Sequence, residues 1–371
     1  MKENRRSFVK KVALSSLFLP FGLPTNLGLG AIPKERKLRV ALVGLGRYAT
    51  RLAQGIALSQ HCEVAGIVTG TPSKIPKWRE KYDISENSVY NYENFDEIIN
   101  NKAIDVVYVV LPNGMHKEYA IRAARAGKHV IVEKPMAITA AECEEIIAEC
   151  NKAGVQLAVG YRLHFEPFNM EMMRLGREKV YGPVRHVEAA LGYNTSGIDR
   201  NDWHLNAKLS GGGCLQNLGV YCIQGARYVT GEEPIAVTAQ LAPVIHKDVF
   251  TEVEESIHWQ MEFPSGATAT CSASSAYPFD RLLASADKGI FELSPAISYG
   301  PFQGRTRGSE TKSFEFPMTH HQQVQMDEMA KYLLNDKPFP SHISGEEGLK
   351  DMKVIDAVYK AAKTGKRVEI V

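Results

Sequence analysis

A strand, a glycine-rich turn and a helix follow one another in residues 37–58, and this unit limits the possible folds more than any other segment. The segment reads KLRVALVGLGRYATRLAQGIAL, with an apolar strand pattern before the glycines and a helical pattern after them. Gly44-x-Gly46-x-x-Ala49 lets the chain turn tightly at Gly44, lets a pyrophosphate approach the backbone at Gly46, and lets the helix pack closely at Ala49. The segment therefore predicts a dinucleotide-binding turn.

Strand and helix patterns alternate through the rest of the first half of the chain. Further strand patterns are EVAGIVTG, AIDVVYVVLPN, HVIVEKP and VQLAVGYRLHFEP. The helix patterns are HKEYAIRAARAG and TAAECEEIIAECNKAG, the second with a Thr139 cap and a Gly154 stop. This α/β alternation predicts a doubly wound parallel sheet over residues 37–160. Short runs follow three strands and should line one crevice at the carboxyl edge of that sheet: Pro112-Asn113, Glu133-Lys134 and Tyr161-Arg162.

The strand pattern Val130 to Val132 ends in two opposite charges and a proline, Glu133-Lys134-Pro135. One interpretation is an ion pair at the rim of the sheet. The other is an active-site lysine at the carboxyl edge, where folds of this class bind ligands.

The end of the second strand indicates which dinucleotide would bind. An NAD site usually has an Asp or Glu here for the ribose 2′-hydroxyl, whereas this chain reads VTGTPSK, with no acid. Hydroxyls and Lys74 would suit a 2′-phosphate, so NADP is favoured over NAD; the alternative is that Lys74 is a solvated lysine at a helix start. The residues expected at the cofactor are Gly44, Gly46, Arg47, Tyr48, Thr69, Gly70, Lys74, Leu111, Pro112, Asn113, His116, Glu133, Lys134 and Arg162.

The first 31 residues have the pattern of a bacterial twin-arginine export signal. Arg5-Arg6 is followed by an aromatic residue and a lysine, then by a weakly apolar stretch and a small-residue site ending at Ala31. The alternative is a disordered basic tail before a short core helix. The apolar stretch is too short to span a bilayer stably. We therefore expect a periplasmic protein without stable membrane insertion, exported folded by the twin-arginine machinery.

Composition is that of an ordinary globular protein, with 44% hydrophobic and 23% charged residues. The net charge is +2, and five of the basic residues lie in the first eleven positions, which leaves the remainder near −2. Nothing in this balance indicates a nucleic-acid partner. The six cysteines show no disulfide or metal spacing, and Cys143 and Cys150 would lie about 10.5 Å apart on one helix. We expect six free thiols and no metal site.

Strings along nearly the whole chain after the signal resemble the glucose–fructose oxidoreductase/inositol dehydrogenase (Gfo/Idh/MocA) family, and most of all its glucose–fructose oxidoreductase branch. They include AGKHVIVEKPMA, GYRLHFEPFN, GGGCLQNLGVYCIQGARYVTGEEP and WQMEFPSGA. The resemblance implies that residues 161–318 form an α+β substrate domain with a large open, mainly antiparallel sheet, through which such proteins oligomerise. It also implies that residues 319–371 form helices that return to the first domain.

The resemblance also implies site residues. Lys134 matches the family lysine that contacts substrate beside the nicotinamide, and its bond to Pro135 should be cis. Tyr221 stands at the catalytic tyrosine, although an apolar helix could equally hold a core tyrosine there. Asn217 replaces the usual family aspartate, which removes a charge. The residues implied at the substrate are Lys134, Arg162, His204, Asn217 and Tyr221.

Three further features are weaker. Asp202-Trp203-His204 is expected to form a loop at the substrate rim, and His164 is a substrate-pocket or packing histidine. Gly211 to Gly213 would allow backbone approach near the site or form a flexible linker. Only about six residues separate the expected cleavage site from the first strand, fewer than the long arm that encloses the cofactor in the family branch named above.

The expected chemistry is hydride transfer between a sugar carbinol and a nicotinamide. A phenol beside an ammonium can remove and return the hydroxyl proton, and we expect the charge of Lys134 to favour the tyrosinate of Tyr221. Three functions remain open: a sugar oxidoreductase with bound NADP, an ordinary dehydrogenase that exchanges its cofactor, and a non-catalytic sensor on the same fold.

Overall fold

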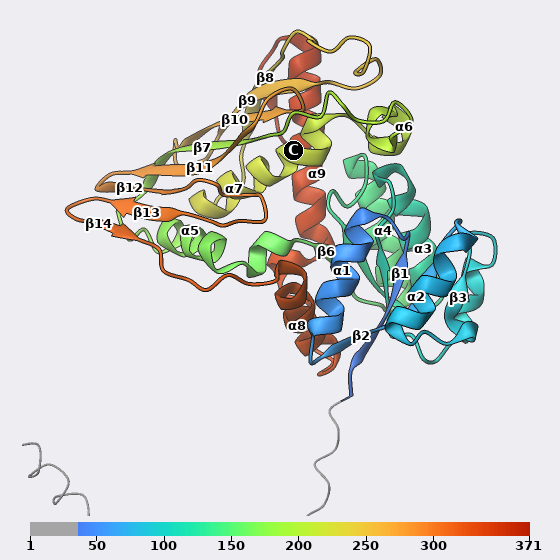
Figure 1. The fold of residues 1–371 in the computed structure, drawn as a ribbon. Coiled ribbons are helices and arrows are strands. Elements are labelled where there is room, and N and C mark those ends of the chain that lie inside the picture. The colour runs from blue at the N-terminus through green and yellow to red at the C-terminus, as the bar shows by residue number, and fades with distance from the viewer. Residues whose placement is uncertain (1–35) are drawn as a thin grey trace, which may run out of the picture. The chain divides into compact units, whose positions relative to one another are not determined.

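Six parallel strands form the first sheet of the computed structural model, which describes residues 36–371 (Figure 1). The predicted export signal lies outside the described residues. The sheet order is β3-β2-β1-β4-β5-β6, which changes direction between β1 and β4 and so opens a crevice there. The strands are β1 (Leu38–Val43), β2 (Cys62–Val68), β3 (Val89–Tyr90), β4 (Val106–Val109), β5 (His129–Glu133) and β6 (Leu157–Gly160).

The helices of this part are α1 (Arg47–Leu58), α2 (Ile75–Tyr82), α3 (His116–Arg125) and α4 (Ala140–Ala153). Helix α4 has the predicted ends, because the Thr139 side chain accepts a hydrogen bond from the Glu142 N–H and Gly154 has φ +67°. The doubly wound parallel sheet is thus confirmed.

The sixth strand is shorter than the sequence pattern predicted. It ends at Gly160, and Arg162–Phe165 form a 3₁₀ turn (η5). The predicted strand was wrong beyond Gly160 because the next helix begins soon after it. Pro167 is the first residue of α5 (Pro167–Arg177), and the Glu166 carboxylate caps this helix by accepting hydrogen bonds from the Phe168 and Asn169 N–H groups.

Nine strands form the second sheet, in the order β14-β13-β12-β11-β7-β10-β9-β8-β15. All neighbouring strands are antiparallel except β7 and β10. The strands are β7 (Val184–Gly192), β8 (Ala236–Leu241), β9 (Ser256–Glu262), β10 (Thr268–Ser274), β11 (Phe279–Ala286), β12 (Gly289–Leu293), β13 (Gly304–Arg307), β14 (Thr311–Ser313) and β15 (Val368–Glu369).

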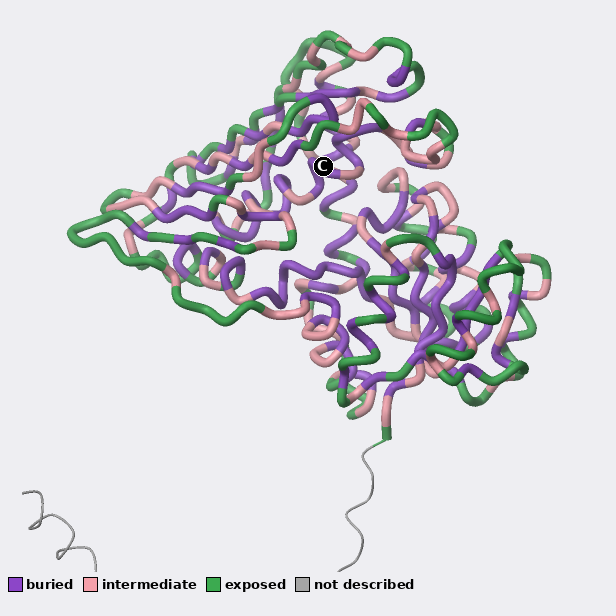
Figure 2. The backbone as a smooth tube through the Cα atoms, viewed as in Figure 1, coloured by how far each residue is buried: buried purple, intermediate pink, exposed green. Residues whose placement is uncertain are grey.

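One face of the second sheet packs against helices and the other is open. Along β9, Ile257, Trp259 and Met261 are buried, whereas His258 and Gln260 are exposed. Figure 2 shows buried and exposed positions alternating along strands of this sheet. Helices α5 and α7 (Val220–Thr230) cover the buried face. The predicted large open, mainly antiparallel sheet is confirmed.

The C-terminal segment contacts both sheets. Helix α8 (His321–Leu333) packs against α1 so closely that a Cβ on Gly55 would lie 2.7 Å from the Gln322 Cβ. Helix α9 (Gly345–Thr364) packs against α4 and β8, and β15 then pairs with β8 through Val368 and Val237. The end of the chain therefore belongs to the second sheet as well as bracing the first.

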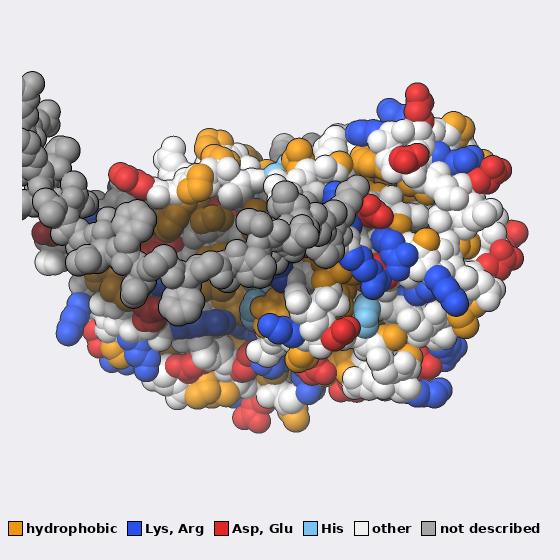
Figure 3. Space-filling view, turned by 90° about the horizontal axis from the view of Figure 1, so that it is seen from below, with side chains coloured by type: hydrophobic (Ala, Val, Ile, Leu, Met, Phe, Trp, Pro, Cys, Tyr) orange, Lys and Arg blue, Asp and Glu red, His pale blue; other side chains and the backbone are white. Residues whose placement is uncertain are grey.

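All six cysteines are buried free thiols, as predicted. Within residues 36–371, no helix combines the length and hydropathy needed to span a bilayer. Where described side chains are visible in Figure 3, acidic and basic groups are intermixed.

Candidate active site

A cavity of about 510 Å³ lies at the carboxyl edge of the first sheet, between that sheet and elements of the second. It brings together every residue that the sequence predicted for cofactor and substrate except Gly70, which packs against Tyr92 instead. The sequence analysis missed several lining residues, which carry no local motif. They are Tyr92, Leu191, Tyr193 and Tyr299; Leu45, Thr71, Val110 and Leu218 also line the cavity and lie within segments that the sequence analysis quoted.

The glycine-rich turn fits a pyrophosphate. Gly44 has φ +89°, and a Cβ there would lie 2.6 Å from the Val110 carbonyl oxygen, so only glycine fits. Gly46 precedes α1, no side chain caps that helix, and nothing lies within 4 Å of where its Cβ would be. The first N–H groups of α1 are thus left for an anionic ligand with room to approach.

The far end of the cavity is polar. Thr69, Thr71 and Lys74 line it, and the Lys74 ammonium donates a hydrogen bond to the Leu45 carbonyl oxygen at 2.8 Å. This contact holds Lys74 at the glycine-rich turn, where a phosphate could share its remaining protons.

Lys134 meets the second domain inside the cavity. The bond to Pro135 is cis, as predicted. The Nζ atom of Lys134 donates to the Asn217 backbone carbonyl oxygen at 2.7 Å and lies 4.5 Å from the centre of the Tyr221 ring. Asn217 belongs to a π-helical turn, Leu215–Gly219 (η7), that directly precedes α7. Such turns occur frequently at functional sites.

Burial shifts the pKa of Lys134 downward to about 8, and the positive charge of Arg162 adds to this shift. The neighbouring Glu133 carboxylate opposes it. Burial also raises the pKa of Glu133, which accepts hydrogen bonds from the Tyr108 hydroxyl at 2.6 Å and the Lys134 N–H at 3.2 Å. The lysine at the strand end is therefore a titrating group in the cavity, not an ion pair at an exposed rim.

The pKa of Tyr221 shifts in the direction opposite to the one expected. Burial raises its pKa, Glu133 adds to this, and the cation that opposes it is Arg162, not Lys134. The expectation of a favoured tyrosinate was wrong, because burial removes water from the Tyr221 hydroxyl. This desolvation destabilises the anion by more than the charge of Arg162 stabilises it. Tyr221 is a neutral phenol at neutral pH.

Arg162 is buried and anchors the wall of the cavity. Its guanidinium donates hydrogen bonds to the Ile297 and Ser298 carbonyl oxygens and contacts the His321 Nδ1 atom at 2.9 Å. Its Cζ atom lies 5.1 Å from the centre of the Tyr221 ring. Arg162 thus connects Tyr221 to loop 294–303 and to α8.

His116 joins two turns of the cavity. Its side chain is 0% exposed, and its ring nitrogens lie 2.9 Å from the Leu111 and Pro135 carbonyl oxygens. Burial lowers its pKa to about 4, so the ring is neutral and donates to one of these carbonyls. It positions the Leu111–Asn113 and Lys134–Pro135 turns relative to each other.

The structure places the two histidines that were named from the sequence in different environments. His204 lines the cavity, stacks on Trp203, and places its Nδ1 atom 2.6 Å from the Asp202 carboxylate. His164 is instead buried between the rings of Tyr161 and Tyr228. Among residues 36–371, no group of three or more His, Cys, Asp or Glu side chains is arranged to hold a metal ion.

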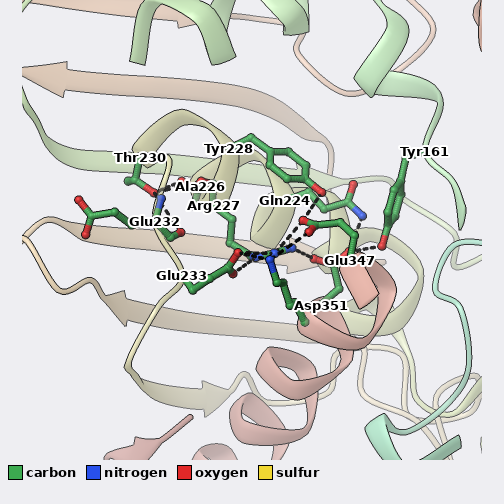
Figure 4. Close-up of polar contacts among 11 residues, drawn as sticks. Tyr161, Gln224, Ala226, Arg227, Tyr228, Thr230, Glu232, Glu233, Glu347 and Asp351 are labelled. Atoms are coloured by element: carbon green, nitrogen blue, oxygen red, sulfur yellow. Dashed lines mark hydrogen bonds and ion pairs between the residues drawn. The ribbon is translucent and has the colours of Figure 1, made fainter. Parts of the chain in front are cut away.

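A buried polar network lies behind the cavity (Figure 4). The Asp351 carboxylate of α9 accepts from the Tyr161 hydroxyl and the Gln224 amide, both at 2.6 Å, and pairs with Arg227. Because Tyr161 precedes Arg162 and Gln224 follows Tyr221 by one helical turn, this network holds α7 against the end of β6. The sequence carried no signal for it, since its members are dispersed along the chain.

The fold and the cavity define a two-domain, dinucleotide-dependent oxidoreductase. Residues 38–161 match the model described as "Oxidoreductase family, NAD-binding Rossmann fold", and residues 170–292 match the GFO/IDH/MocA C-terminal domain. The chain belongs to the GFO/IDH/MocA family, and it is an NAD(P)-dependent oxidoreductase acting on CH–OH groups.

Known relatives match the chain over most of its length. D-xylose 1-dehydrogenase [NADP(+)] of Haloarcula marismortui is 27% identical, covering 91% of this chain and 94% of the relative. The structure of aldose–aldose oxidoreductase from Caulobacter crescentus, complexed with glycerol, is 42% identical with a TM-score of 0.86, covering 90% of this chain and 100% of that one. Levoglucosan dehydrogenase with NADH and levoglucosan, at 18% identity and TM-score 0.78, covers 90% and 100% and shares the fold.

Proposed function

We propose that the chain is an NADP-dependent sugar oxidoreductase whose cofactor stays bound while one sugar is oxidised and a second is reduced. The observation that carries this proposal is the meeting of Lys134 and Tyr221, with Nζ 4.5 Å from the ring centre, in the cavity that also holds the glycine-rich turn. The nicotinamide, when bound, supplies the acceptor and donor of the hydride.

The preference for NADP is supported by Thr69, Thr71 and Lys74, which offer two hydroxyls and an ammonium where an acid would select NAD. The D-xylose dehydrogenase relative is named as NADP-dependent. Gly46 and the free N–H groups of α1 would hold the pyrophosphate.

Proton transfer is assigned to Lys134 and Tyr221. The Tyr221 phenol, whose pKa is raised, donates a hydrogen bond to the sugar oxygen. Lys134, whose pKa is lowered to about 8, takes the hydroxyl proton during oxidation and returns it during reduction. The Asn217 carbonyl oxygen holds one Lys134 proton and so aims the Nζ atom.

A sugar substrate is supported by the polar end of the cavity and by the relatives. His204 and Asn217 line it beside Lys134 and can bond to hydroxyl groups. One relative is named a D-xylose 1-dehydrogenase and another an aldose–aldose oxidoreductase.

The location of the protein and its assembly are part of the proposal. The twin-arginine pattern supports export of the folded protein to the periplasm, where a released nicotinamide cofactor could not be replaced. A retained cofactor recycled by two sugars removes that difficulty. The open face of the second sheet would join protomers into an oligomer.

An ordinary dehydrogenase with exchangeable cofactor is the second candidate, favoured by the short segment between the predicted cleavage site and β1. Absorbance and fluorescence of the purified protein distinguish the two. A retained cofactor gives bound-nucleotide absorbance after gel filtration, fluorescence that rises with one sugar and falls with a second, and ping-pong kinetics. A protein that purifies without nucleotide, and whose activity saturates with added NADP, establishes the second candidate instead.

A further inference from the structure

Two arginines at the start of α1 each contact a loop of the second domain. Arg47 and Arg51 are four residues apart and therefore lie on one face of the helix. The Arg47 guanidinium lies 3.8 Å from the Asp202 carboxylate, in loop 193–206. The Arg51 Cζ atom lies 3.8 Å from the centre of the Tyr299 ring, in loop 294–303. The helix turn that would face the pyrophosphate is thus held by two cross-domain contacts.

Tyr299 is the stronger of these contact points. A second guanidinium group also lies close to its ring, because the Arg162 Cζ atom is 4.3 Å from the ring centre. The ring also stacks on His321, with centres 5.5 Å apart and planes 29° apart. Stacking of arginine on an aromatic face is favourable, and more so where water is partly excluded.

Hydrogen bonds to a strand of the second sheet hold the loop that carries Tyr299. The Asp280 carboxylate accepts hydrogen bonds from the N–H groups of Ala296, Ile297 and Ser298, at 2.8, 2.7 and 2.9 Å. Because three consecutive N–H groups end on one carboxylate of β11, the loop is tied to the second sheet. Separation of the two domains must therefore break the Arg51–Tyr299 stack.

The Asp202 contact is the weaker one. The Arg47 side chain is 91% exposed, so its ion pair is screened by water. Asp202 is nevertheless held in place, since it also accepts from the His204 backbone N–H at 3.1 Å. We expect it to add less than Tyr299.

We propose that the Arg51–Tyr299 and Arg47–Asp202 contacts form a clasp that retains the dinucleotide. This inference depends on the proposed dinucleotide site. Residues of both domains line the cavity, including Tyr299 itself, so a dinucleotide bound there contacts both domains. The clasp opposes separation of the domains at the turn that binds the pyrophosphate.

The test measures dissociation of NADPH from the full-length holoprotein. The protein is loaded with NADPH and mixed with a large excess of NADP⁺, and loss of bound-NADPH fluorescence gives the release rate. Tyr299→Ala and Arg51→Ala should each increase that rate about 3- to 30-fold, as expected for loss of one stacked cation. Asp202→Ala should increase it less, and Tyr299→Phe, which keeps the ring, should leave it near the wild-type value.

Arg79→Ala is the matched control, because Arg79 is an arginine of α2 whose contacts, Ile84 and Glu86, lie in the first domain. Thermal melting of each variant identifies any that fails to fold, and Tyr299→Leu replaces Tyr299→Ala in that case. A release rate for both the Tyr299 and Arg51 variants within twofold of wild type overturns the clasp. The wild-type rate separately tests cofactor retention: release within seconds contradicts the proposed function, whatever the ratio between variants and wild type.

Discussion

Lys134 donates a hydrogen bond from its Nζ atom to the backbone carbonyl oxygen of Asn217 over 2.7 Å. The acceptor is a main-chain atom, so the orientation of the Lys134 side chain does not depend on the side chain at position 217. That side chain lines the same cavity and can change the local charge without moving the lysine. A main-chain atom of Asn217 therefore sets the position of the Lys134 amine, whereas burial and the charge of Arg162 lower its pKa.

The two half-reactions should depend on pH in opposite directions. The pKa of Lys134 is lowered to about 8, so the free amine that accepts a proton increases as pH rises through that value. Sugar oxidation should speed up between about pH 7 and 9 and then level off, and sugar reduction should slow over the same range. Single-turnover fluorescence across this range measures both, and parallel profiles would assign the proton transfer to another group.

Asn217→Asp should move this pH profile upward. A carboxylate within about 4–6 Å of an ammonium stabilises its charged form and shifts its pKa by about 1–3 units. The oxidation midpoint should rise accordingly, while Asn217→Ala, which keeps the carbonyl acceptor and adds no charge, should leave the midpoint in place. An unchanged midpoint in the aspartate variant would place the side chain away from Lys134.

Lys134→Met should keep the fold and the bound cofactor and lower turnover by about 10²- to 10⁴-fold, because the general base is removed. Pre-steady-state rates and nucleotide content of the purified variant measure the two effects. Lys152→Met, on the exposed surface of α4, serves as the control. Near-normal turnover in the Lys134 variant would contradict its catalytic role.

Lys74→Ala should weaken NADP binding more than NAD binding. The ammonium lies at the glycine-rich turn, bonded to the Leu45 carbonyl oxygen at 2.8 Å, and only NADP carries a phosphate for it to pair with. A loss of about 1.5–3 kcal/mol is expected for NADP. Titration calorimetry of stripped protein with each dinucleotide gives the comparison. Equal losses would make Lys74 a contact of the pyrophosphate or of the surface.

Arg227→Met should lower the free energy of unfolding by about 3–5 kcal/mol, because it leaves buried carboxylates without a cation. The Arg227 side chain is 1% exposed and pairs with Glu347 at 2.7 Å and with Asp351. Arg185→Met, which breaks an exposed pair with Asp287, should cost at most about 1 kcal/mol. Urea unfolding measures both.

The loss in Arg227→Met should also depend on pH. Burial raises the pKa of Asp351 to about 6, and Arg227 opposes that rise, so the variant binds a proton at Asp351 more readily still. A group whose folded pKa is raised favours the folded state at low pH and less so as pH increases through that pKa. The deficit should therefore be smaller at pH 5 than at pH 8, and an equal deficit would show that Asp351 stays ionised.

The sequence by itself determined the first domain and most of its residues that line the cavity. Periods of two and of 3.6 residues, the Thr139 cap and the Gly154 stop are local features, and each depends on only a few neighbours. Gly44 and the charged end of β5 could be recognised for the same reason. A positive φ favours glycine, and a buried strand end shows in the sequence as an apolar run followed by charged residues.

Only the tertiary structure decided which groups meet and how they titrate. Asn217 lies 83 residues from Lys134, and Tyr299 lies in a loop whose position depends on a carboxylate in another strand. The sequence analysis could place Tyr221 near a cation, yet it gave its pKa the wrong direction. Desolvation depends on all the atoms packed around a group, and those atoms come from distant parts of the chain, so no local pattern records it.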